Sequence, residues 1–179
     1  MKLLKNLFQK PTINMEKLGI SAADMAALAL KPHEIQRIAT LGEAGEKYFI
    51  ADRGLLRLKE GTVEQLCDWF EIQQAIWAGE SKRLVIRWVD PQRTPLTLHL
   101  AEHEQTSFMR LFDEKVAQTI VLTMRRKAEN GTNLIGTIRR RGDGKLFSAL
   151  VADGPLDPAA KKLGIELEKN LRDAVGLAD

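Results

Sequence analysis

Along the first half of the chain, apolar residues recur at the short intervals typical of strands, and glycine-containing turns interrupt them. In the segment Arg83–Val89, the residues Leu84, Ile86 and Trp88 occupy alternate positions. Side chains at alternate positions of a strand share one face, so these three indicate a strand with a single buried side. The pattern predicts seven short antiparallel strands, at about 35–41, 48–51, 55–58, 63–67, 73–78, 83–89 and 96–100.

Two segments that flank these strands have a helical period instead. Ser21 and Asp24 form a capping-box pattern, which predicts a short helix at 22–30 that ends before Pro32. A longer helix is expected at 104–118. Its apolar stripe contains Phe108, Leu111, Phe112 and Val116. The β-branched run after Gln118 favours an end there, although a helix that continues to Arg126 also fits the pattern.

The remaining third of the chain predicts a strand meander followed by a helix. Asn130-Gly131 and Asp143-Gly144 suit two-residue hairpin turns, so strands are expected at about 120–128, 132–141 and 145–152. With such a turn, Lys127 would lie opposite Leu134. Asp157 and Pro158 are suited to the cap and first turn of a final helix. Its apolar stripe contains Ala160, Leu163, Leu167, Leu171 and Ala174.

The composition is that of an ordinary soluble globular protein. The 179 residues are 44% hydrophobic and 28% charged, and no run approaches the roughly 18 apolar residues of a membrane span. Cys67 is the only cysteine and therefore has no intramolecular disulfide partner. Because the first residues also lack a secretory signal, we expect a cytoplasmic protein. The net charge of +3 is too small to indicate a polyanionic partner by itself.

Seven antiparallel strands followed by an amphipathic helix resemble the pleckstrin-homology-like barrel. The stretch Tyr48–Leu56 is similar to the turn between the second and third strands of bacterial domains of this kind, and Leu66–Ile72 with the Gly79 hairpin is similar to their strand, corner and hairpin. From about Ile20 to Gly176 the chain resembles an uncharacterised family of small actinobacterial cytoplasmic proteins. That resemblance implies a fold and no activity.

The expected fold is therefore α+β, with a seven-stranded antiparallel barrel of the pleckstrin-homology-like kind and a capping helix. A three-stranded meander and a C-terminal helix follow it. The corresponding domain limits are an N-terminal extension with a short helix at 1–32, the barrel and its closing helix at 33–118, and a β-β-β-α appendage at 119–179.

The sequence contains no recognisable catalytic motif. It lacks a phosphate-binding loop, a nucleophile elbow, a zinc-protease helix and a Cys-x-x-Cys pair, and Gly142–Lys145 is interpreted as a turn between strands. His99 and His103, with Glu102 and Glu104, have the residue types of metal ligands, but they straddle a strand-to-helix junction and are interpreted as surface residues. Cys67 is expected to be a buried small apolar residue. We expect no enzyme activity, no cofactor and no metal.

A basic segment supplies the only sequence feature that suggests a ligand. Between residues 125 and 145 it contains Arg125, Arg126, Lys127, Arg139, Arg140, Arg141 and Lys145. These residues could bind nucleic acid or anionic lipid, together with the Lys2–Lys10 segment. In the predicted hairpin, however, the two clusters lie about 20 Å apart, and neighbouring side chains alternate faces.

The favoured interpretation is therefore a non-catalytic binding or scaffold module with a protein or peptide partner. The basic residues would then keep strand edges soluble. Electrostatic binding of nucleic acid or an anionic membrane is the alternative.

Overall fold

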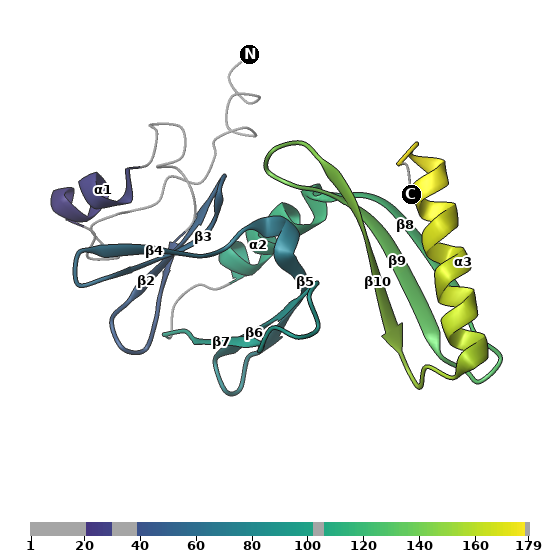
Figure 1. Ribbon diagram of the computed structural model, residues 1–179. Coiled ribbons are helices and arrows are strands. Elements are labelled where there is room, and N and C mark those ends of the chain that lie inside the picture. Colours follow the sequence, from purple (N-terminus) through teal and green to yellow (C-terminus); the bar gives the residue numbers. More distant parts are fainter. Residues whose placement is uncertain (1–20, 30–38, 102–105, 178–179) are drawn as a thin grey trace, which may run out of the picture. The chain divides into compact units, whose positions relative to one another are not determined.

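The computed structural model describes residues 21–29, 39–101 and 106–177 of the chain. The chain divides into two compact units, Met1–Glu114 and Lys115–Asp179. Each unit combines antiparallel sheet with helix (Figure 1), so the expected α+β class is confirmed.

The first unit contains two antiparallel sheets with simple meander order. Strands β1 to β4 form a four-stranded sheet and β5 to β7 a three-stranded one, each in chain order. The strands are β1 (Ala39–Leu41), β2 (Lys47–Ala51), β3 (Gly54–Lys59), β4 (Thr62–Cys67), β5 (Ile72–Ala78), β6 (Arg83–Trp88) and β7 (Leu96–His99). All seven occur where the alternation predicts them, and the predicted start of the first, 35–38, lies outside the described residues.

The two sheets meet along one edge. Gly42, just after β1, forms an isolated antiparallel bridge with Leu100, just after β7. The amide of Ala101 donates to the carbonyl of Leu41 over 2.8 Å, which extends this contact. On the opposite side, no ladder joins β4 to β5 in the described part of the chain, so a closed barrel is not observed. The turn η1 (Trp69–Glu71) connects these two strands.

Helix α1 (Ala22–Leu28) covers part of the first sheet. Its predicted capping box is present, since the amide of Asp24 donates to Ser21 Oγ and the amide of Ser21 donates to Asp24 Oδ2. Leu28 is fully buried in the same apolar cluster as Phe49 and Leu56 of the neighbouring strands. Burial of such apolar area provides the main free energy that holds a short helix in place.

Helix α2 (Thr106–Gln118) buries the aromatic part of its predicted stripe. Phe108 and Phe112 are both fully buried. The ring of Phe112 meets Trp69 edge to face, with 5.3 Å between ring centroids. The helix ends at Gln118 and the next strand begins at Ile120, so the alternative of a helix continuing to Arg126 is wrong.

The second unit is a three-stranded sheet with one helix on it. Its elements are β8 (Ile120–Lys127), β9 (Asn133–Arg140), β10 (Leu146–Asp153) and α3 (Pro158–Ala174), and β9 is the central strand. Helix α3 lies along one face of the sheet (Figure 1), where Leu167 and Leu171 pack with Leu134 and Ile138. Asp157 caps α3 as predicted, accepting from the amide of Ala160.

The prediction of two-residue turns in this meander is wrong, because both loops have three residues. The amide of Ala128 donates to the carbonyl of Thr132, and the amide of Gly131 donates to the carbonyl of Ala128. The second hairpin repeats these bonds between Arg141, Gly144 and Lys145. In each loop only the last residue, Gly131 or Gly144, has positive φ, as expected for a type I turn followed by a left-handed residue.

The side chain before each glycine explains this choice of turn. Asn130 Oδ1 accepts from the amide of Thr132, and Asp143 Oδ1 accepts from the amide of Lys145, both at 3.0 Å. Such bonds favour a local turn in which the Asn or Asp keeps negative φ. The longer loop shifts the register by one, so Lys127 pairs with Asn133 and not with Leu134 as predicted.

Candidate functional site

Strand β5 is an edge strand with an unpaired side. It stands at the end of its sheet, and among the described strands it forms a ladder with β6 alone. The amide of Leu100 donates to the carbonyl of Lys82, which fixes the alternation of hydrogen bonds along β6. By that alternation, the backbone groups of Ala75 and Trp77 point away from β6. Within the described residues they have no hydrogen-bond partner.

Beyond a register shift between Ile72 and Gln74 at its start, β5 lacks the usual protection of an edge. Its residues are Ile-Gln-Gln-Ala-Ile-Trp-Ala, without charge, proline or glycine. Ile76 lies on the outer face of the sheet, opposite Val85, and is 37% exposed. Strand β4, the edge of the other sheet, differs because it carries Glu64, which pairs with Arg57. Of these two strands, β5 therefore has the edge that is open to another strand on grounds of charge.

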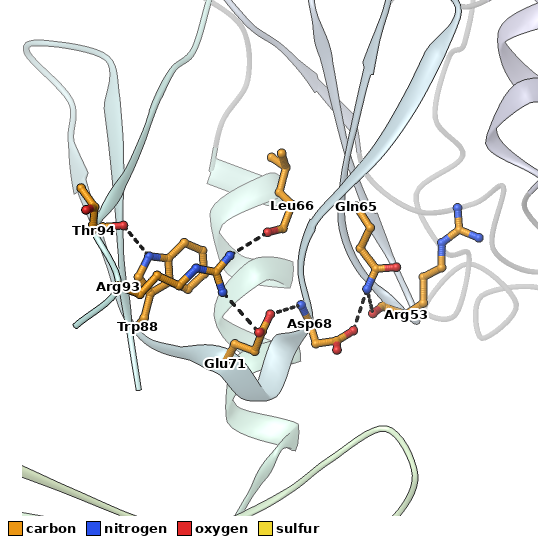
Figure 2. A network of polar contacts seen from close by, with 8 residues as sticks. All are labelled: Arg53, Gln65, Leu66, Asp68, Glu71, Trp88, Arg93 and Thr94. Carbon is orange, nitrogen blue, oxygen red and sulfur yellow. Dashed lines mark hydrogen bonds and ion pairs between the residues drawn. The ribbon is translucent and has the colours of Figure 1, made fainter. Parts of the chain in front are cut away.

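A network of polar contacts fixes the corner that leads into β5 (Figure 2). The guanidinium of Arg93, in the loop after β6, lies 3.2 Å from Glu71 Oε1 and donates to the carbonyl of Leu66 in β4. It also stacks over the ring of Trp88, 3.7 Å from the centroid. The other oxygen of Glu71 accepts from the amide of Asp68. These contacts connect β4, the corner and the β6–β7 loop.

The corner network extends to the turn after β2. The amide nitrogen of Gln65 donates to Asp68 Oδ1 and to the carbonyl of Arg53 (Figure 2). Partial burial, and then the neighbouring Glu71 carboxylate, raise the pKa of Asp68. Because its residues already bond one another and Arg93 is exposed, we interpret the network as a structural element that positions β5.

The basic residues at 125–127 surround a hollow at one end of the second sheet. Arg125, Arg126 and Lys127 are all exposed, and they line a hollow of about 460 Å³ together with Asn133, Leu134, Ile135 and Asp153. The register places Arg125 and Lys127 on the face away from α3. Arg126 is opposite Leu134 and therefore lies on the face towards it. One acidic side chain, Asp153, lies among these cations.

The second basic cluster lies at the other end of the sheet and is not uniformly accessible. Arg139 is buried, at 3% exposure, and its Nε donates to Thr137 Oγ1 over 3.3 Å. Burial lowers the pKa of this guanidinium. Arg140 is exposed, Arg141 lies over the ring of Phe147, and Lys145 pairs with Asp143. From Asn133 to Arg140 the strand rises about 23 Å, so the structure does not bring the two clusters together.

The residues considered for covalent or metal chemistry do not form a site within the described part of the chain. Cys67 is buried, and burial together with Glu71 raises the pKa of its thiol to about 12, so little nucleophilic thiolate forms near neutral pH. His99 lies 3.7 Å from Glu43. His103, Glu102 and Glu104 lie outside the described residues. No group of three metal-ligating side chains is found in the parts described.

The edge of β5 was not identified from the sequence, although one signal for it was available. The seven residues of this strand form an uncharged run in a chain of which 28% is charged. The position of β5 at the end of a sheet could not be read from that run.

No family model, curated protein or solved structure matches the chain. None of the described helices is long and apolar enough to cross a membrane.

Proposed function

We propose that the chain is a non-catalytic binding module whose first unit takes up an extended peptide segment of another protein as an extra strand beside β5. The observation that carries this proposal is the unpaired, uncharged backbone edge of β5. An added strand would satisfy the outward groups of Ala75 and Trp77, and backbone bonds of this kind supply affinity in strand addition. Ile76 would provide an apolar contact for alternate side chains of the ligand.

In the same proposal, the seven strands and α2 form a pleckstrin-homology-like barrel that is open between β4 and β5. Two contacts support it. The bridge between Gly42 and Leu100 joins the outer strands of the two sheets. Phe112 of α2 packs on Trp69 of the connecting corner. In such an arrangement the opening lies beside the edge that would receive the peptide.

The test begins with a random decapeptide library, displayed and selected against the full chain. The selected peptide is synthesised, and its binding to the Ala75→Pro variant is measured by fluorescence anisotropy. Proline at this position removes an outward amide and leaves the bonds to β6 intact. We expect an affinity loss of about tenfold or more, because a backbone bond is lost and the ring occupies the space of the incoming strand.

Thr123→Pro is the matched control, because it places proline at an exposed, outward-pointing position of the β8 edge. This variant should bind the peptide as the unmodified chain does. Circular dichroism establishes that both variants are folded. Equal affinity of folded Ala75→Pro and the unmodified chain, or failure to select any peptide, would contradict the proposal.

A second candidate function, binding of nucleic acid or anionic lipid, rests on the hollow lined by Arg125, Arg126 and Lys127. Asp153 reduces the local positive charge, and the other cluster is beyond the screening length of about 8 Å. For a peptide-binding module we expect weak binding to a DNA duplex or to phosphatidylserine vesicles. Reversing the charges at 125–127 and reversing those of Arg140 and Arg141 should lower this weak affinity by similar factors.

Titrations at several salt concentrations measure this difference. A true polyanion site would have submicromolar affinity at physiological salt, with a log–log salt slope of about 0.9 for each DNA phosphate contacted. Reversal of 125–127 alone would then abolish binding. That result would favour the second candidate function. Arg139 is left unchanged in these variants because it is buried.

A further inference from the structure

We propose that two copies of this chain associate through β10 of the second unit, so that their sheets join into one six-stranded antiparallel sheet. Strand β10 stands at the end of the order β10-β9-β8. It forms a regular eight-residue ladder with β9, without a bulge, from Leu146 to Asp153. Its other side is the surface through which the second copy would bind.

The outward side of β10 has a continuous row of unpaired backbone groups. The amide of Arg141 donates to the carbonyl of Lys145, so the odd-numbered residues of β10 bond to β9. The even-numbered residues therefore point their backbone groups outward. They are Leu146, Ser148, Leu150 and Ala152, and in the described part of the chain these groups have no hydrogen-bond partner.

The two edges of this sheet are protected to very different degrees. Strand β8 ends in three exposed cations, Arg125 to Lys127, and has a bulge between Ile120 and Leu122. Charges and bulges are the devices by which natural proteins prevent edge pairing. Strand β10 has no bulge, and its one charged residue is Asp153 at its end, since Leu146–Ala152 contains no charge. This difference between the two edges favours pairing of the β10 edge with another strand.

A second copy of β10 fits this edge because the strand is complementary to itself in one antiparallel register. With Ala149 opposite Ala149 of the second copy, Leu146 is opposite Ala152 and Ser148 is opposite Leu150, so all outward groups pair. On the other face, Phe147 is opposite Val151, a favourable aromatic pair.

The charged residues at the ends of β10 select this register. Lys145 of each copy lies opposite Asp153 of the other, which gives an opposite-charge pair at both ends of the interface. Sliding one strand by two residues in one direction places Asp153 opposite Phe147. Sliding it the other way places Asp153 opposite Asp143, where like charges repel. Only the first register places Lys145 and Asp153 opposite a residue of opposite charge.

The helix face of the sheet carries apolar side chains that such a dimer would cover. Leu150 projects towards α3 beside Gly164 but is still 38% exposed. Ile165 is 70% exposed and lies one turn from Glu168, whose carboxylate accepts a hydrogen bond from Ser148 of β10. Both apolar side chains therefore flank the β10 edge.

In the dimer, Leu150 and Ile165 would lie between the two α3 helices. Helix α3 packs on all three strands, so its axis runs over β9. Across the joined sheet, the two helix axes would be three strand spacings, or about 14 Å, apart. Directly packed helices are 8–10 Å apart, so Leu150 and Ile165 of both copies would fill the remaining space.

Sedimentation equilibrium of the full chain tests the proposal, and we expect a concentration-dependent dimer. The variants Lys145→Glu and Asp153→Lys should each weaken the dimer about fivefold to thirtyfold, because each substitution acts at both ends of the interface. The double variant with both changes should restore it. Both side chains are exposed, so neither change disturbs the core.

Proline variants identify the strand edge involved. Ala152→Pro removes an outward amide at both ends of the interface and should abolish the dimer, whereas Thr123→Pro on β8 and Ala75→Pro on β5 should leave it intact. Circular dichroism establishes that each variant is folded. A monomer at high concentration, a dimer lost with Ala75→Pro, or a dimer unaffected by Ala152→Pro would overturn the proposal. Charge-swap variants that fail to restore association would overturn the register.

Discussion

The variant Phe112→Ala is expected to lower the free energy of unfolding of the first unit by about 3 to 5 kcal/mol. Phe112 is fully buried, and its ring lies edge to face with Trp69 and 6.3 Å from the ring of Phe108. Truncation removes the aromatic contact and leaves a cavity that these two rings cannot fill, because Trp69 is held by a 2.8 Å hydrogen bond from its Nε1 to the carbonyl of Ala51.

Urea unfolding followed by tryptophan fluorescence measures this loss, since all three tryptophans, Trp69, Trp77 and Trp88, belong to the first unit. Leu111→Ala is the control. Leu111 precedes Phe112 on the same helix but is only half-buried, so its truncation should cost clearly less. Equal losses for the two variants would mean that the Phe112 ring does not have the packing role assigned to it.

The second large effect is expected at the turn between β2 and β3, where Gly54→Ala should destabilise the first unit by about 2 to 6 kcal/mol. Gly54 has φ +151°, a backbone angle that residues with a side chain rarely adopt. A Cβ at this position would lie 2.1 Å from the backbone oxygen of Cys67. Backbone strain costs about 1–3 kcal/mol and overpacking a similar amount. The obstacle is main chain of β4, so the neighbouring strand itself has to move.

Gly61→Ala separates conformational strain from this close approach. Gly61 also has positive φ, +75°, but no atom lies within 4 Å of the position of its Cβ. Its substitution should therefore cost only about 1–2 kcal/mol, the penalty for a left-handed residue. The same urea experiment compares the two variants. Equal stability of the Gly54→Ala and Gly61→Ala variants would contradict the close approach of Gly54 in β3 to the backbone of Cys67.

The sequence by itself determined the elements of this protein. Alternation of apolar residues located the seven strands of the first unit, and the stripe through Phe108 and Phe112 located α2. Asp157 and Pro158 located the start of α3. These features are local, because side-chain period and capping depend on residues within one or two turns of each other. The two meander turns were located correctly, but their length was wrong.

Only the tertiary structure decided the features on which the functional proposals depend. Sequence period shows that β5 and β10 are strands, but not that each stands at the edge of a sheet, because strand order depends on contacts between distant segments. Likewise, Arg139 and Arg140 are neighbours of the same charge, yet one is buried and the other exposed. Exposure and free hydrogen-bonding groups are properties of the packed chain, and a linear pattern does not contain them.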